Sequence, residues 1–411
     1  MECHRLGNRG PLDPTASRSD LSQTRTVDLE KLRRKPELMP QDNGIADSES
    51  LLAGLLRWVE FETPTGRVDV IGKLLDHIVS EASPLGCGIE RIAGRDGMGD
   101  HLILRFAGGP ARGILCTNHL DTVCTPGSVP MRRDGDRFHG PGIADMKGGA
   151  YLAFSAIRNI VRSGQMMPGP LTLVFNTDEE IGSPTSRAVI QDEARKVACA
   201  LIPEPARGDE AITFRKGRAK YRIDITGREA HAGSAFADGR SAISEMARTI
   251  VALDEMTDIS AGTTVNVGYV SGGTEPNVVA GKAHCLVDVR FSENDAGHAV
   301  EQNLRRLAPR DPQVRIDVAG EIEKPCLDRS ADTLDLFRHA EQIAREIGPT
   351  LVETSSGGGS DGNFTSAAGT PTLDGLGAIG NFWHSPNEHI IVSALARREL
   401  LLRRLFLTLG G

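Results

Sequence analysis

The chain has 411 residues, which suffices for two domains or for one large domain with an insertion. Its net charge of −8 and its aromatic content of 4% argue against a nucleic-acid-binding surface. Seven scattered cysteines without a CxxC pair predict neither a disulfide framework nor a zinc finger, and they fit a reducing, cytoplasmic compartment. No apolar run approaches the ~18 residues of a membrane span, so we expect no membrane partner.

The first 47 residues are polar and rich in Arg, Pro, Asp and Ser, and their lack of periodicity predicts a flexible extension. Regular structure is expected from Ser48, a candidate N-cap for a helix with an apolar stripe up to Val59. A second amphipathic helix is predicted at 68–81, followed by strands at 103–106 and 114–117.

The strand at 114–117 leads into His119 and Asp121. Because residues two apart in an extended chain face the same side, these two side chains are expected to lie together. A carboxylate beside a histidine can fix the ring tautomer and raise its basicity as a metal ligand. An ordinary His–Asp pair explains the two residues equally well, so this motif alone leaves both interpretations open.

The segment GPGIADMKGG, residues 140–149, precedes a helix predicted at 150–162. Asp145 lies near the start of that helix, where helix capping is the ordinary role of an aspartate. The glycines allow close approach of the backbone. So unusual a motif favours a functional role for Asp145, namely a carboxylate that bridges two metal ions.

The stretch from Leu171 to Pro205 is the central feature of the sequence. A predicted buried strand at 171–175 runs into three consecutive acids that end at Glu180, and a second strand at 198–202 delivers Glu204. Neighbouring strands that end in carboxylates present ligands at the carboxyl edge of an α/β sheet. A solvated acidic turn explains the stretch taken alone, but the matching ligands elsewhere favour a metal site.

After Pro205 the pattern predicts strands and helices in a βαββαβ-like order. The strands are expected at 219–226, 263–270, 283–291 and 314–318, and the helices at 237–256 and 296–307. This order predicts an inserted α+β domain with two helices on one face of an antiparallel sheet. His231 lies at a glycine-flanked turn within it, and loops are where functional residues collect.

Past Pro325 the alternation of helices and strands returns, with helices predicted at 332–346 and 393–407. Between them, the glycine-rich loop at 355–362 can present backbone N–H groups to an anion. No Walker lysine follows, so we prefer a substrate carboxylate to a phosphate. His384 lies on a later loop and is a further candidate.

Taken in order, the motifs resemble those of the M20 metallopeptidases, which include glutamate carboxypeptidases, acetylornithine deacetylase, succinyl-diaminopimelate desuccinylase and aminoacylase. The motifs are HLDTV, GPGIADMKGG, NTDEEIGS, EPA, REAHAG, the glycine-rich loop and HSPNE. The resemblance covers residues 48–411 and is strongest to the bacterial glutamate carboxypeptidase branch.

This resemblance implies an α/β fold with a zinc-dependent exopeptidase-like catalytic domain, whose central mixed sheet is flanked by helices. It also implies an inserted α+β, ferredoxin-like domain that acts as lid and dimerisation module. The expected boundaries are an extension at 1–47, a first catalytic part at 48–212, the insertion at 213–323 and a second catalytic part at 324–411.

The resemblance further implies two zinc ions, although Co²⁺ or Mn²⁺ would suit the same ligands. Asp145 would bridge the ions, His119 and Glu204 would complete one site, and Glu180 and His384 the other. The catalytic roles would fall to Glu179 as general base, Asp121 as the carboxylate that holds His119, and His231, which would reach across a homodimer to stabilise the oxyanion. The substrate-binding residues would be Asn277, Arg290, Gly358, Gly359 and Ser360.

The implied activity is hydrolysis of an amide bond that releases a C-terminal amino acid, with glutamate as the first choice, from an N-acyl or peptidyl substrate. The alternative is an N-acyl amino acid deacylase, similar to acetylornithine deacetylase or the desuccinylase. Ala211 and Lys324 stand near positions where the glutamate carboxypeptidase branch carries basic residues, which puts glutamate selectivity in question. A non-catalytic protein on the same scaffold would show eroded ligands, whereas all five ligands and Glu179 are present.

Overall fold

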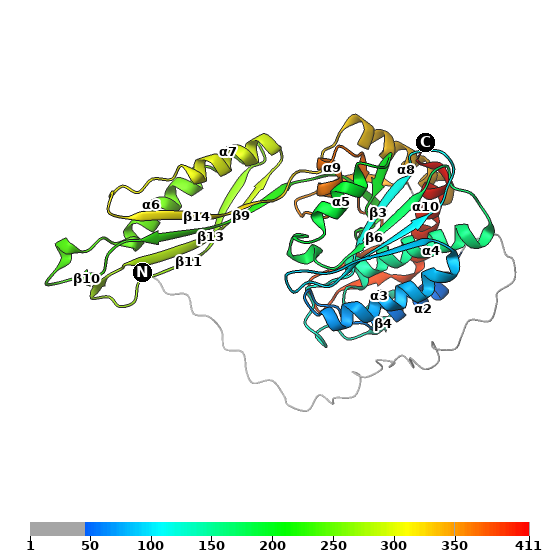
Figure 1. Ribbon diagram of the computed structural model, residues 1–411, viewed down its shortest axis with the longest axis horizontal. Helices are drawn as coiled ribbons and strands as arrows, with labels where there is room; N and C mark the ends of the chain where they lie inside the picture. Colours follow the sequence, from blue (N-terminus) through cyan, green and yellow to red (C-terminus); the bar gives the residue numbers. More distant parts are fainter. Residues whose placement is uncertain (1–45, 349, 411) are drawn as a thin grey trace, which may run out of the picture. The chain divides into compact units, whose positions relative to one another are not determined.

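The computed structural model describes residues 46–348 and 350–410 (Figure 1). The predicted extension at 1–47 therefore lies almost wholly outside the described residues. The first helix of the described residues, α2 (Ser48–Val59), is capped by Asp47, whose carboxylate accepts a hydrogen bond from the Ser50 N–H at 3.1 Å. The prediction of Ser48 as the cap was wrong by one residue, because Ser48 already belongs to the helix.

A six-stranded mixed sheet forms the centre of the larger module, in the order β1-β2-β6-β3-β7-β16. Its strands are β1 (Gly88–Ile92), β2 (His101–Phe106), β6 (Leu171–Asn176), β3 (Ile114–His119), β7 (Cys199–Leu201) and β16 (Thr372–Leu373). The pairs β6–β3, β3–β7 and β7–β16 are parallel, whereas β1–β2 and β2–β6 are antiparallel. Three neighbouring parallel strands, β6, β3 and β7, thus end at one edge of the sheet.

Helices cover both faces of this sheet, which explains why its strands appear as continuous apolar runs. They are α2, α3 (Val68–Ala82), α4 (Gly149–Ser163), α5 (Arg187–Ala194), α8 (Ala331–Ile347), α9 (Gly362–Ala367) and α10 (Leu395–Thr408). Val174 packs with Ile190 of α5 and Phe364 of α9, while its neighbour Phe175 meets Trp58 of α2 on the other face. The predicted α/β class with a central mixed sheet is confirmed.

Residues 217–324 contain a separate antiparallel sheet in the order β11-β13-β9-β14. Its strands are β9 (Gly217–Thr226), β11 (Thr264–Gly272), β13 (Lys282–Phe291) and β14 (Arg315–Lys324), with α6 (Ala242–Asp254) and α7 (Asn294–Arg305) as crossovers. Figure 1 shows both helices on one face of the sheet, as the ferredoxin-like order predicts. This part of the chain is called the inserted module below.

The two faces of the inserted sheet differ in character. Tyr221 and Ile223 of β9 are buried in one hydrophobic cluster with Met246 of α6 and Leu304 of α7. The alternate positions of β9, such as Arg218 and Lys220, lie on the opposite face and are polar.

Two boundaries in the inserted module differ from the sequence prediction by more than two residues. Helix α6 begins at Ala242, after the Ser241 cap, because residues 236–238 form a separate single turn. Strand β14 continues to Lys324, beyond the predicted end at Val318, because its ladder with β9 persists through a bulge near Glu323.

Smaller sheets connect distant parts of the chain. β15 (Val352–Ser356) pairs in parallel with β8 (Glu210–Arg215), and β10 (Ala230–His231) pairs with β12 (Val278–Val279). β18 (His389–Ile391) lies between β17 (Gly380–Asn381) and β5 (Arg137–His139), and β5 also pairs with β4 (Arg132–Asp134). The β18–β5 pairing brings the loop of His384 next to the segment that carries Asp145.

Within the described residues, no helix has the length and apolar character that crossing a membrane would require. The six cysteines in the same part of the chain are all free thiols, in agreement with the expected lack of a disulfide framework.

Candidate metal centre

Asp145 lies between two histidines that are distant in sequence. Its Oδ1 is 3.1 Å from Nε2 of His119, and its Oδ2 is 3.1 Å from Nε2 of His384. The segment from Ile143 to Gly148 makes an irregular turn before α4, and this turn directs the Asp145 side chain towards both rings.

Each histidine also meets a second carboxylate. Glu204 Oε1 is 3.8 Å from His119 Nε2, and Glu180 Oε2 is 3.3 Å from His384 Nε2. Ligand atoms around a tetrahedral zinc ion, with bonds of about 2.0–2.1 Å, lie roughly 3.4 Å apart. Among the described residues, His119, Asp145 and Glu180 form a group of three whose ligand atoms all lie within 4.8 Å of one another. Glu204 and His384 lie beside this group.

The sheet explains why these side chains converge. His119 is the last residue of β3, while Glu180 follows β6 and Glu204 follows β7. These strands are parallel neighbours, so their carboxyl ends meet at one edge, which is the usual ligand-binding edge of an α/β sheet. The predicted acid-bearing strands do end at one edge, but they are not direct neighbours, because β3 lies between β6 and β7.

His384 comes from the short connection between β17 and β18. Both His384 and Phe382 have a positive φ, at 61° and 58°, in a region that side chains other than glycine rarely adopt. Such local strain tends to occur at functional sites. The His384 ring is half exposed, whereas the side chains of His119, Asp145, Glu180 and Glu204 are at most 12% exposed.

The electrostatics of the cluster favour a cation. Burial raises the pKa of Glu180 to about 7, and burial together with the charge of Asp145 raises the pKa of Glu204 well above its usual value. Hydrogen bonds to Asp145 and Glu180 raise the pKa of His384 to about 10. The site thus holds more carboxylates than its histidines balance, and the mixed N/O donor set suits zinc.

Asp121 supports the cluster in a different way from the one expected. His119 Nδ1 bonds to the Asp121 backbone carbonyl at 3.0 Å, whereas the nearest carboxylate oxygen is 3.6 Å away. A carbonyl can only accept, so Nδ1 carries the proton and Nε2 is free to ligate. The Asp121 carboxylate instead accepts from the Thr65 hydroxyl at 2.8 Å and from the N–H groups of Glu179 and Glu180 at 3.2 Å.

Glu179 is buried beside the cluster and forms an ion pair with Lys324, the last residue of β14. Burial alone would raise the pKa of Glu179, but Lys324 and His119 outweigh this effect and hold the pKa below its usual value. Glu179 is therefore ionised at neutral pH, as a general base has to be.

Sequence reasoning missed Glu388, the last residue of HSPNE. It is buried, and its carboxylate accepts from the N–H groups of Ala144 at 2.9 Å, Asp145 at 3.0 Å and Gly142 at 3.2 Å. Glu388 therefore holds the turn that carries Asp145. Its place in the HSPNE motif was the available signal, but the sequence did not indicate that Glu388 would bind the turn around Asp145.

The inserted module carries two further candidate residues, His231 and Asn277. His231 is exposed on β10, and its Nδ1 accepts from the N–H groups of Gly233 and Ser234, both at 3.1 Å. The backbone carbonyl of Asn277 accepts from Ala232 N at 2.9 Å. The hydrogen bonds and ion pairs of the described residues do not join His231 or Asn277 to the Asp145 cluster.

The substrate-binding candidates near the glycine-rich loop are already engaged within the chain. Arg290 bonds to Asp288 at 2.7 and 3.0 Å and to the Gly357 carbonyl at 3.2 Å. The Gly358 carbonyl accepts from Arg215 at 3.2 Å.

Two further positions of the glycine-rich loop face inward. Ser360 is fully buried, and its hydroxyl donates to Asp374, which also pairs with Arg215. A Cβ at Gly359 would lie 2.8 Å from Cδ of Lys324, so glycine is required for this close approach.

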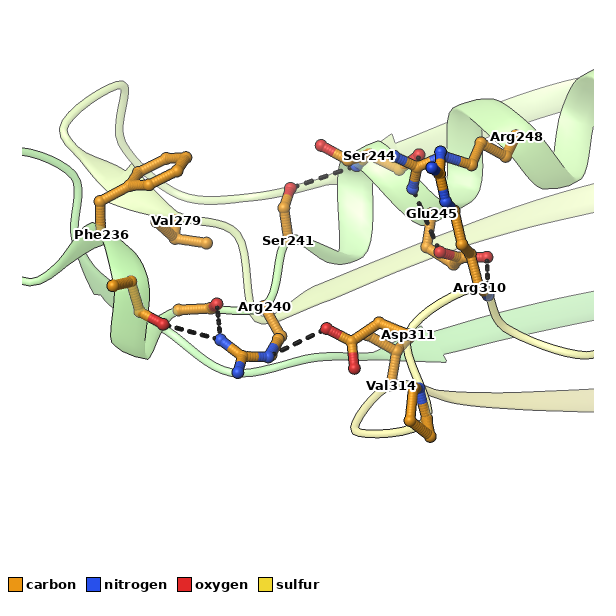
Figure 2. Close-up of a pocket in the computed structure, with 13 residues that line it drawn as sticks. Phe236, Arg240, Ser241, Ser244, Glu245, Arg248, Val279, Arg310, Asp311 and Val314 are labelled. Carbon is orange, nitrogen blue, oxygen red and sulfur yellow. Dashed lines mark hydrogen bonds and ion pairs between the residues drawn. The ribbon is translucent and has the colours of Figure 1, made fainter.

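A cavity of about 570 Å³ lies in the inserted module (Figure 2). None of the candidate metal ligands lines it. Two of its three arginines are paired internally, Arg240 with Asp311 at 2.9 Å and Arg248 with Glu245 at 3.2 Å. A smaller cavity of about 290 Å³ is lined by Arg207 and Trp383, which lie close in sequence to Glu204 and His384. The smaller cavity therefore has lining residues that are sequence neighbours of two candidate metal ligands.

Comparisons with known proteins show the family of the chain. The model of peptidase family M20/M25/M40 matches residues 115–408. Carboxypeptidase G2 from Pseudomonas sp. (strain RS-16) is 30% identical over 89% of this chain and 90% of its own. Acetylornithine deacetylase from Myxococcus xanthus is 27% identical over 86% of this chain and 96% of its own.

Solved structures show the same fold. The aminopeptidase PepT from Bacillus cereus superposes with a TM-score of 0.73 at 23% identity, over 89% of this chain and 99% of its own. An M20 family metallo-carboxypeptidase from Sulfolobus solfataricus superposes with a TM-score of 0.69 at 14% identity, over 87% of this chain and 99% of its own. The chain is a hydrolase that belongs to the M20/M25/M40 peptidase family.

Proposed function

We propose that this chain is a di-zinc amidohydrolase that releases a C-terminal amino acid, glutamate in the first instance, from an N-acyl or peptidyl substrate. The observation that carries the proposal is the shared carboxylate of Asp145, whose oxygens each lie 3.1 Å from a histidine nitrogen. The similarity to carboxypeptidase G2 supports a carboxypeptidase rather than a deacylase.

His119 and Glu204 would hold one zinc ion, Glu180 and His384 the other, and Asp145 both. When bound, the ions would polarise the scissile carbonyl and make an attacking water more acidic. Co²⁺ and Mn²⁺ remain chemically compatible with the same donors.

Glu179 is the proposed general base. It accepts the proton of the attacking water and passes it to the leaving amine. Two contacts support this role: Asp121 fixes the Glu179 N–H, and Lys324 stabilises the ionised carboxylate. Lys324 contacts Oε1 of Glu179, so the other carboxylate oxygen can accept from the water while the ion pair persists.

His231 is the proposed oxyanion donor, supplied by the second subunit of a homodimer. Because Nδ1 accepts two backbone hydrogen bonds, the proton of the neutral ring is on Nε2, which is therefore a donor. Exposed Ile243 and Val251 on α6, together with the edge strand β11, support a dimer through the inserted module.

Arg290 is the proposed partner of the substrate's α-carboxylate, with Asn277 and the loop of Gly358, Gly359 and Ser360 around it. The alternative function, an N-acyl amino acid deacylase, is supported by the acetylornithine deacetylase relative, which matches over a similar share of the chain. The two functions differ in the side of the amide that is recognised.

Amino-acid release by the zinc-loaded protein from a matched panel tests the proposal. The panel contains acyl- and peptidyl-glutamates, N-acetyl amino acids, N-acetyl-ornithine and N-succinyl-diaminopimelate. Preference for the glutamate-ended members is expected. Preference for short acyl groups on other amino acids would favour the deacylase, and no turnover with two ions bound would contradict both functions.

A further inference from the structure

Three cations form a row across the inserted sheet. In the strand register, Arg290 of β13 is directly opposite Arg218 of β9, and Arg218 is directly opposite Lys324 of β14. Residues in such positions share a face of the sheet, here the face opposite α6 and α7. Like charges directly opposite each other destabilise a sheet, so this row needs an explanation beyond folding.

One end of the row contacts the candidate base beside the metal centre, and the other end contacts the glycine-rich loop. Lys324 pairs with Glu179, the candidate base. Arg290 donates to the Gly357 carbonyl in the glycine-rich loop at 3.2 Å. Arg218, between them, approaches the turn that follows Glu179, since a Cβ on Gly182 would lie 3.5 Å from its Nη2.

Arg218 is the member of the row whose present partner is most easily replaced. Arg290 is held by two contacts to Asp288, and Lys324 is fully buried against Glu179. Arg218 has one ion pair, to Glu323 at 2.8 Å, on the bulge of β14. Glu323 is also 3.6 Å from Lys220, so it keeps a cationic neighbour when Arg218 binds another anion.

We propose that Arg218 binds a second carboxylate on the amino acid that the enzyme releases, while Arg290 binds the α-carboxylate. The substrate class is then an N-acyl or peptidyl dicarboxylic amino acid. This proposal rests on the proposed function and adds a residue that determines specificity. A guanidinium suits the role because its planar fork matches a carboxylate in two contacts.

The test compares two substrates that share one acyl group and end in glutamate or glutamine, which have similar shapes but differ in charge. Arg218→Gln is expected to lower kcat/KM for the glutamate substrate by about 10- to 100-fold, mainly through KM, and to change the glutamine substrate by less than about 3-fold. Arg218→Lys should fall between wild type and Arg218→Gln, because it retains the charge without the fork.

Lys220→Gln is the matched control, because Lys220 lies on the same strand and face and also neighbours Glu323. It is expected to leave the ratio of kcat/KM for the two substrates unchanged. Each of three outcomes would overturn the proposal. They are an unchanged ratio of the two kcat/KM values in Arg218→Gln, an equal change of that ratio in Lys220→Gln, and a wild-type preference for the glutamine substrate.

A binding measurement separates this proposal from the proposed function. Calorimetry on the full-length, zinc-loaded protein compares glutarate, which has two carboxylates, with butyrate, which has one. Arg218→Gln should weaken glutarate binding by about 10- to 100-fold and leave butyrate binding unchanged. If the wild type hydrolyses no member of the panel, the proposed function fails, whereas equal binding of glutarate by wild type and Arg218→Gln refutes the role of Arg218.

Discussion

Glu388 accepts a hydrogen bond from the backbone N–H of Asp145, 243 residues away along the chain. The same carboxylate also accepts from Ala144 and Gly142, so it fixes the turn that carries Asp145. The position of Asp145 between two histidines therefore depends on a residue whose side-chain hydrogen bonds, within the described part of the chain, go to neither ring.

The first prediction concerns Glu388→Gln. A glutamine has one carbonyl oxygen and an NH₂ group, so it cannot accept from all three N–H groups. The affinity for zinc is expected to fall about 10- to 100-fold, as for other residues that orient metal ligands, and titration with a zinc-competing chelator measures it. Glu399→Gln is the control, since Glu399 is equally buried but bonds to Asn159 in α4. Equal zinc affinity in wild type and Glu388→Gln would contradict the role.

Glu179→Ala tests the base. The variant should still bind two zinc equivalents, because the proposed ligands are unchanged. Its turnover should fall by about 10²–10⁴-fold, because the group that transfers the proton is lost. Metal analysis and single-turnover rates on the same sample distinguish the two effects. Retained turnover would remove Glu179 from the mechanism.

His384→Ala tests the second group of ligands. It removes the ring that lies 3.1 Å from Asp145 and 3.3 Å from Glu180, so one of two zinc equivalents should be lost after gel filtration. Since the ring is half exposed, its removal is expected to leave the melting temperature of the metal-free protein nearly unchanged. A sample that still holds two equivalents would exclude His384 as a ligand.

The role of His231 across a dimer predicts recovery of activity on mixing. His231→Ala and Glu179→Ala are each expected to be inactive, but a hybrid dimer has one site with both groups intact. Statistical exchange of subunits should then restore about a quarter of the wild-type sites. Absence of recovery, with hybrid dimers demonstrated by mass spectrometry, would place His231 in its own subunit's site or outside the mechanism.

The ion pair between Arg105 of β2 and Glu193 of α5 predicts a dependence of stability on pH away from the centre. Burial would raise the pKa of Glu193, but the Arg105 contacts of 2.6 and 3.0 Å, together with Lys196 at 2.7 Å, outweigh it and lower the pKa. A carboxyl group with a lowered folded-state pKa stabilises above its unfolded pKa of about 4.5, and this stabilisation is lost as the pH falls further.

Glu193→Gln should therefore lower the free energy of unfolding near pH 6 by about 1 kcal/mol, because Arg105 is 40% exposed and solvent weakens the pair. The difference from wild type should shrink towards about pH 3.5. Thermal unfolding across this range measures both values. A difference that grows with acid would contradict the assignment.

The sequence predicted those parts of the centre that follow from strand ends. His119, Glu180 and Glu204 terminate neighbouring parallel strands, and that arrangement is visible in apolar runs followed by acids. The role of Glu388 and the contact of Lys324 with Glu179 escaped prediction, because these partners lie 243 and 145 residues apart and no periodicity marks such pairs. The orientation of Asp121 was missed for a similar reason, since spacing does not distinguish a carbonyl from a carboxylate.

The hydrogen bonds of Asp121 have a consequence for the interpretation of kinetics. One carboxylate connects Thr65 with the backbone of both Glu179 and Glu180, so a shift of any of these groups moves the others. Free-energy changes at positions that share such a network do not add. A double-mutant cycle between Thr65 and Glu179 should accordingly show a coupling energy, although the side chain of Thr65 takes no part in the chemistry.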